Sequence, residues 1–227
     1  MKIKICGLFR EQDIDYANEA RPDYTGFVFA ESKRKITPAK AAILRRRLSD
    51  KIIPVGVFVN TPIKDITALY QDGIISIAQL HGTEDEAYIA QLKEASGNTP
   101  IPVIKVIKYS SNPSTEYTEE KSQRITRINT NNNYLCNSRN SLTPSIDYYL
   151  LDSGSGSGKP FDWKLLNSLN IEKPWFLAGG INMDNIKQAM TFNPFAIDVS
   201  GGAETEGVKD REKMLQLTAI IRKGNIA

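Results

Sequence analysis

The sequence predicts a single (β/α)8 TIM barrel, an α/β fold, spanning residues 1–227. Eight short apolar runs rich in β-branched residues recur along the chain, and segments with helical patterning separate them. This alternation is typical of βαβ units with right-handed crossovers, which build a parallel sheet. Eight such units in 227 residues favour a closed barrel, with an open doubly wound sheet as the alternative fold.

The predicted elements follow in chain order. The strands are KIKIC (2–6), TGFVFA (25–30), IIPVGVFVN (52–60), SIAQLHG (76–82), IPVIKVIK (101–108), DYYLLD (147–152), PWFLAGG (174–180) and FAIDVSGG (195–202). Two of the intervening helices have clear start signals. Thr37 followed by Pro38 predicts one start, before the apolar residues Ala41, Ile43, Leu44 and Leu48. Asn182 predicts the other, before Met183, Ile186 and Met190.

One segment, residues 109–146, interrupts this rhythm within the single predicted domain. It is rich in Ser, Thr and Asn and poor in residues that form a core. At most one weak helix fits it, over residues 115–128, and a polar loop around residues 131–133 is expected to be mobile.

Composition narrows the classes of function. The 29 basic and 26 acidic residues are spread along the chain, so we expect no nucleic-acid partner. Cys6 and Cys136 lie far apart, which suits a reducing compartment and gives no four-ligand metal pattern. No apolar stretch is long enough to span a membrane, and the first residues lack the apolar core of a signal peptide. We therefore expect a cytoplasmic protein without a metal or a membrane partner.

A glycine-rich stretch, LLDSGSGSGKPFDW (150–163), raises the question of a flexible linker or an anion site. It is no nucleotide P-loop, because Ser153 replaces the first glycine and Pro160 replaces the hydroxyl residue. A dinucleotide fingerprint fails because Lys159 replaces its third glycine. However, AGGI (178–181) and VSGG (199–202) close the next two strands. Consecutive glycine-rich strand ends in a barrel favour a phosphate site, and hence a small phosphorylated ligand.

Two side chains at predicted strand ends are candidates for proton transfer, because catalytic groups of such barrels lie at the carboxyl ends of strands. Cys6 ends the first strand and is either a general base or nucleophile, or a small core residue. Asp152 ends the sixth strand behind apolar residues that would raise its pKa and keep a proton on it.

Three further side chains at strand ends are candidates for binding. Arg34 offers a planar fork suited to a carboxylate, or is an exposed loop charge. His81 is interpreted as a structural group or a substrate contact in preference to a catalyst. Asp198 contacts substrate or hydrogen-bonds the backbone beside the glycines.

Several motifs in order resemble the phosphoribosylanthranilate isomerase family of tryptophan biosynthesis. They are KICG (4–7), GFVF (26–29) followed by SKR (32–34), VGVFVN (55–60), QLHG (79–82), LLD (150–152) followed by GSGKPFDW (156–163), LAGGI (177–181), and DVSGG (198–202) followed by an acid. The glycine motifs occur in many phosphate-binding barrels, whereas their combination with KICG and QLHG is specific. The resemblance implies a barrel without cofactor or metal that performs an Amadori rearrangement of N-(5'-phosphoribosyl)anthranilate.

The resemblance also implies roles for individual residues. Cys6 matches the family's general base, Asp152 its general acid, and Arg34 the group that holds the anthranilate carboxylate. The residues implied at the phosphate are Gly156, Gly179, Gly180, Ser200 and Gly201. The sequence departs from the family at Ser155, where a glycine is usual, and at Lys35, where an aromatic residue is frequent. The segment 109–146 is longer than expected for the family.

Other functions fit less well. An indole-glycerol-phosphate synthase would need a lysine base, and a pentose-phosphate epimerase would need metal-binding histidines, which one histidine does not supply. A non-catalytic phosphate-binding barrel would not need both Cys6 and Asp152. The sequence leaves open whether the protein is a monomer or a homodimer.

Overall fold

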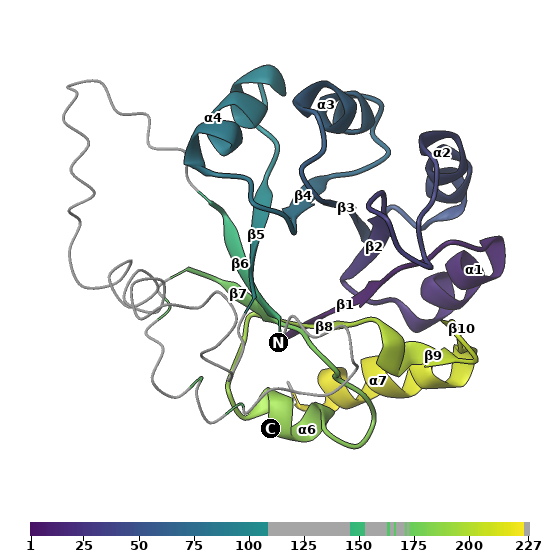
Figure 1. Cartoon of the computed structure of the whole chain (residues 1–227). Coiled ribbons are helices and arrows are strands. Elements are labelled where there is room, and N and C mark those ends of the chain that lie inside the picture. Colours follow the sequence, from purple (N-terminus) through teal and green to yellow (C-terminus); the bar gives the residue numbers. More distant parts are fainter. Residues whose placement is uncertain (109–145, 153–162, 164–165, 167–170, 172, 225–227) are drawn as a thin grey trace.

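The computed structural model describes residues 1–108, 146–152, 163, 166, 171 and 173–224. Eight parallel strands, hydrogen-bonded in the order of the sequence, form a closed barrel (Figure 1). They are β1 (Lys2–Cys6), β2 (Tyr24–Val28), β3 (Ile53–Phe58), β4 (Ile77–Leu80), β5 (Val103–Lys108), β6 (Tyr148–Asp152), β7 (Trp175–Leu177) and β8 (Ala196–Val199). The predicted barrel is therefore confirmed, and the open sheet is excluded because β8 pairs with β1.

Helices surround the strands on the outside of the barrel (Figure 1). They are α1 (Glu11–Ala20), α2 (Pro38–Arg47), α3 (Ile63–Gln71), α4 (Glu86–Ala95), α6 (Ile186–Met190) and α7 (Arg211–Gly224). Between β8 and α7 lie the 3-10 turn η2 (Gly201–Ala203) and a small hairpin of β9 (Glu204–Thr205) and β10 (Val208–Lys209). Within the described ranges, no helix is both long and apolar enough to cross a membrane.

The two predicted helix starts have different outcomes. At α2, the side chain of Thr37 caps the helix by accepting a hydrogen bond from the Lys40 N–H at 3.2 Å, as predicted. At α6, the helix begins at Ile186, later than the Asn182 signal indicates. The Asn182 side chain instead accepts from the Asp184 N–H at 2.9 Å, which forms a local turn ahead of the helix.

Buried side chains form two layers. One cluster lies between the strands and the helices, and alternate residues of the strands form a second cluster in the barrel interior. Phe176 is central to the second cluster, where its ring makes edge contacts with Tyr24, Tyr148 and Phe195. Tyr24 and Tyr148 begin their strands, Phe176 is the middle residue of β7, and Phe195 lies just before β8.

The segment predicted at residues 109–146, with its weak helix at 115–128, falls outside the described residues except for Ile146. Its predicted mobility and its place within a single domain therefore stay predictions. Cys136 lies in this segment as well.

Adjacent residues of α2 provide a matched test of the outer layer. Leu44 is fully buried, whereas Ile43 is 41% exposed. Leu44→Ala should lower the free energy of unfolding by about 2–5 kcal/mol, because it removes a packed side chain and leaves a cavity. Ile43→Ala should change it by less than about 0.5 kcal/mol. Urea unfolding followed by circular dichroism measures both values, and equal losses would contradict the orientation of α2.

Candidate functional site

A cavity of about 1120 Å³ opens at the carboxyl ends of the strands. It gathers nine of the predicted site residues, from loops and strands distant in the sequence. These are Cys6, Arg34, His81, Asp152, Gly179, Gly180, Asp198, Ser200 and Gly201. The tenth, Gly156, lies outside the described residues, as does Ser155. Among the described residues, no group of three or more His, Cys, Asp or Glu side chains is placed to hold a metal ion.

Cys6 lies beside a buried ion pair that the sequence did not predict. Lys4 precedes it by two residues on β1, so both side chains face the barrel interior. The Lys4 Nζ donates to Asp198 Oδ2 at 2.9 Å, and the two side chains are 0% and 7% exposed. The predicted backbone hydrogen bond of Asp198 is thus replaced by an ion pair between β1 and β8. Asp198 lines the cavity, and its contact with substrate stays a prediction.

The electrostatic environment of Cys6 keeps it protonated in the ligand-free protein. Burial raises the pKa of the Cys6 thiol, and the positive charge of Lys4 lowers it only in part. Asp198 raises this pKa further, while Lys209 lowers it. For Lys4, burial alone would lower the pKa, but Asp198 and Cys6 raise it, so Lys4 remains an ammonium.

The position of the Cys6 sulfur also depends on the neighbouring strand. Cys6 pairs with Gly26 of β2, and a Cβ atom at Gly26 would lie 2.6 Å from Cys6 Sγ. No side chain other than hydrogen fits there without displacing the sulfur. The thiol is therefore held between two strands rather than on a loop.

Arg34 packs over Gly7 and is part of an ion-pair network. Its Nε donates to Glu204 Oε1 at 2.6 Å, and its Nη2 donates to Glu204 Oε2 at 2.7 Å. Lys209 Nζ also donates to Glu204 Oε1, at 2.5 Å, and to the Ser200 carbonyl at 3.0 Å. Arg34 is therefore no isolated loop charge, because a buried carboxylate fixes its guanidinium at the cavity wall.

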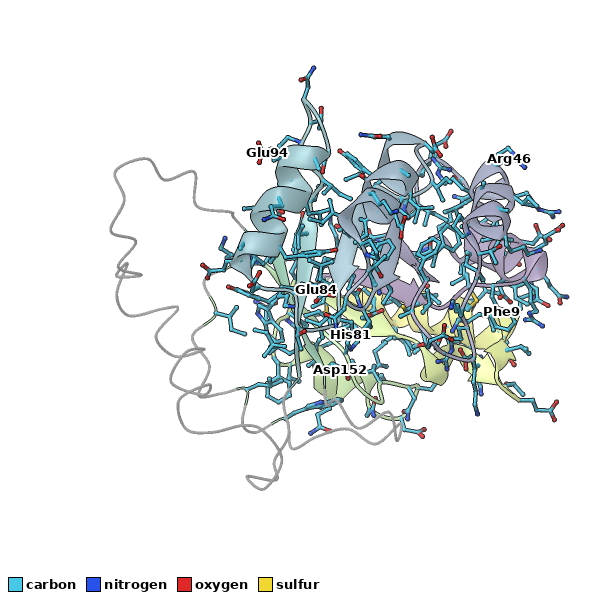
Figure 2. All side chains as sticks on the ribbon, turned by 45° about the horizontal axis from the view of Figure 1, so that its top comes forward. Phe9, Arg46, His81, Glu84, Glu94 and Asp152 are labelled. Carbon is cyan, nitrogen blue, oxygen red and sulfur yellow. The ribbon has the colours of Figure 1, made fainter. Side chains whose placement is uncertain are left out.

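His81 and Asp152 lie next to each other (Figure 2), and both line the cavity. His81 follows β4 and Asp152 ends β6, and His81 Nε2 lies 3.3 Å from Asp152 Oδ2. The two side chains are 25% and 23% exposed, so Asp152 is in contact with both a polar neighbour and the cavity. The interpretation of His81 as a structural group or substrate contact is consistent with this position.

The glycine-rich ends of β7 and β8 adjoin each other. Gly179 and Gly180 have φ values of 93° and 66°, a backbone conformation that favours glycine. At Gly202, a Cβ atom would lie 2.0 Å from the Ile181 carbonyl oxygen, so the two loops pack in direct contact. Their backbones form one wall of the cavity, where closely approaching N–H groups suit an anionic ligand.

Sequence reasoning gave no role to three charged residues that pair with site residues: Lys4, Glu204 and Lys209. Lys4 had a detectable signal, because it is a charged residue at an inward-facing position of an otherwise apolar strand. Lys35, the second departure from the family pattern, pairs with Glu31 in an exposed position.

A family model and a related protein both match this chain over nearly its whole length. The family model described as "N-(5'phosphoribosyl)anthranilate (PRA) isomerase" matches residues 3–128 and 112–219. N-(5'-phosphoribosyl)anthranilate isomerase of Endomicrobium trichonymphae is 42% identical over 222 residues, covering 97% of this chain and 98% of the relative.

Two solved structures are similar over nearly their whole length. One shows monomers generated from the dimeric phosphoribosylanthranilate isomerase of Thermotoga maritima, with 28% identity, a TM-score of 0.72, and coverage of 99% of both chains. The other is a phosphoribosyl anthranilate isomerase in complex with reduced 1-(o-carboxyphenylamino)-1-deoxyribulose 5-phosphate. It has 26% identity and a TM-score of 0.72, and the match covers 98% of this chain and 99% of that one.

The environment of Cys6 predicts the pH range in which its thiol loses a proton. In a Cys136→Ser variant, which leaves a single thiol, thiolate absorbance in the ultraviolet should appear at higher pH in the native protein than in the urea-unfolded protein. The reason is that burial and the charge of Asp198 together raise the pKa of Cys6 more than Lys4 and Lys209 lower it. A native titration midpoint below that of the unfolded chain would contradict this environment.

Proposed function

The chain belongs to the N-(5'-phosphoribosyl)anthranilate isomerase family, and we propose that Cys6 and Asp152 perform its reaction as general base and general acid. The reaction is the aldose–ketose isomerisation of N-(5'-phosphoribosyl)anthranilate to 1-(o-carboxyphenylamino)-1-deoxyribulose 5-phosphate, in tryptophan biosynthesis. The synthase and epimerase alternatives are set aside, because the match to this family covers nearly the whole chain.

The first step opens the sugar ring. Asp152 donates a proton to the furanose oxygen, the bond from this oxygen to the anomeric carbon breaks, and the lone pair of the anthranilate nitrogen forms an iminium. In the second step, the Cys6 thiolate removes the proton from the adjacent carbon, and the electron pair of that C–H bond forms an enolamine as the iminium is neutralised. Tautomerisation then gives the ketone. The substrate's nitrogen serves as the electron sink, so one acid and one base suffice.

The observation that carries this proposal is the meeting of Cys6 and Asp152 in one cavity. They end β1 and β6, which are separated by β7 and β8 around the barrel, so the two groups approach a bound sugar from different sides. Because Cys6 is a thiol in the ligand-free protein, it must lose its proton before it can act as a base. Lys4 and Lys209 are the cations that favour this loss.

The two ends of the substrate are assigned to different groups of cavity-lining residues. We assign the phosphate to the glycine loops, using Gly179, Gly180, Ser200 and Gly201, with Gly156 added on the basis of the sequence alone. Arg34 is assigned to the anthranilate carboxylate, and His81 to a contact near the ring oxygen because it lies beside Asp152. Holding both ends places the reacting carbons between acid and base.

Turnover of the variants Cys6→Ala and Asp152→Asn tests these roles. Each should lower kcat by about a hundredfold or more, since general acid–base groups commonly contribute 10²–10⁴. Both variants should stay folded and bind reduced 1-(o-carboxyphenylamino)-1-deoxyribulose 5-phosphate nearly as tightly as the unchanged protein. Loss of phosphoribosylanthranilate fluorescence measures the rate, and Cys136→Ala is the matched control with unchanged turnover. Near-normal kcat in Cys6→Ala would require another base.

A further inference from the structure

Arg34 binds Glu204 with only one edge of its guanidinium. A guanidinium carries five N–H donors in a plane, and the Nε and Nη2 donors of one edge are used by the two oxygens of Glu204. The donors of the second edge, on Nη1 and the remaining N–H of Nη2, point away from Glu204. That second edge has the spacing that binds a carboxylate through two parallel hydrogen bonds.

We infer that Glu204, supported by Lys209, is a positioning residue that holds the first edge of Arg34 and so presents the second edge to the substrate carboxylate. The inference rests on the proposed role of Arg34. It differs from the simpler view in which Glu204 occupies Arg34 until substrate displaces it. In the inferred arrangement, Glu204 and substrate bind Arg34 at the same time.

The arm of Arg34 packs against the backbone of Gly7. A Cβ atom at Gly7, where φ is 85°, would lie 2.3 Å from Arg34 Cδ, so the arm passes directly over the glycine backbone. Glu204 is itself fixed, because its side chain is 7% exposed and its carbonyl accepts from Lys213 Nζ at 2.6 Å. The flexible arm of an arginine is thus aligned by a rigid acceptor from the hairpin that follows β8.

Lys209 explains how Arg34 attracts the substrate carboxylate although Arg34 is already paired with Glu204. Arg34 and Glu204 alone would form a neutral pair, with little attraction for a carboxylate. Lys209 is fully buried, and burial lowers its pKa, whereas its ion pair with Glu204 opposes this shift. As an ammonium, Lys209 adds a second cation to the same carboxylate, and the three groups together then carry one net positive charge. Although burial raises the pKa of Glu204, hydrogen bonds from Arg34 and Lys209 lower it overall, so Glu204 stays ionised.

Two ligands distinguish a positioning role of Glu204 from a general contribution of Glu204 to the stability of the protein. One is reduced 1-(o-carboxyphenylamino)-1-deoxyribulose 5-phosphate, and the other is the same compound without its carboxyl group. The intact protein should bind the first more tightly, and titration calorimetry measures the ratio. If the intact protein turns over substrate normally but does not prefer the ligand with the carboxyl group, the proposed role of Arg34 is overturned. The inference is then overturned with it. Absence of turnover in the intact protein would instead contradict the proposed function.

Glu204→Gln should lower affinity for the carboxylate ligand about tenfold, because the amide offers Arg34 only one acceptor. Affinity for the ligand without the carboxyl group should change less than about twofold. In kinetics, KM should rise about tenfold with kcat nearly unchanged. Equal losses for both ligands would show a merely structural role, and tighter binding of the carboxylate ligand would show that Glu204 competes with substrate; either result overturns the inference.

The double variant Glu204→Gln/Lys209→Met distinguishes alignment from charge and covers the case in which the single variant does not fold. It keeps one net positive charge, on Arg34, and replaces the buried lysine arm with an apolar one. The preference for the carboxylate ligand should still fall about tenfold; a retained preference would show that charge alone suffices and would overturn the inference. Glu206→Gln, which removes an exposed acid from the same hairpin, is the control that should change nothing.

Discussion

The buried ion pair between Lys4 and Asp198 is the interaction on which the site depends. It joins β1 to β8 at the seam that closes the barrel, where Lys4 and Asp198 are direct partners in the strand register. Two charges in an apolar interior are costly unless they meet, so closure of the seam and satisfaction of the pair occur together. The pair then places an ammonium beside Cys6, and the same event that completes the fold therefore completes the electrostatic setting of the candidate base.

The two ion-pair clusters around Cys6 contain more positive than negative charge. Lys4, Arg34 and Lys209 face two carboxylates, those of Asp198 and Glu204, and each carboxylate orients a cation without cancelling the whole. This excess suits a substrate with an anion at each end. The carboxylates of Asp198 and Glu204 are engaged in these ion pairs, whereas Cys6 and Asp152 are the groups proposed for proton transfer.

The sequence predicted those strands and helix starts that depend on residues close together in the chain. Strands such as KIKIC and helix starts such as Thr37 depend on neighbouring residues, and the ends of parallel strands meet by topology, so Cys6 and Asp152 could be placed in one cavity. The ion-pair partners on other strands and loops were not predictable, because Asp198 pairs with Lys4 across 194 residues and Glu204 pairs with Arg34 across 170. The start of α6 was missed for a local reason, since Asn182 has two competing uses, as a helix cap and as a turn. Gly156 stays a sequence prediction.

The long separations in the site have a consequence for synthesis of the chain. Lys4 and Arg34 leave the ribosome early, whereas Asp198 and Glu204 follow only near the end of translation. Until then, β1 lacks its closing partner and the nascent barrel has an open edge, which is prone to pairing with other chains. The candidate site is therefore completed only late in translation, and a chain truncated before residue 198 would lack the seam between β1 and β8 and the Glu204 partner of Arg34.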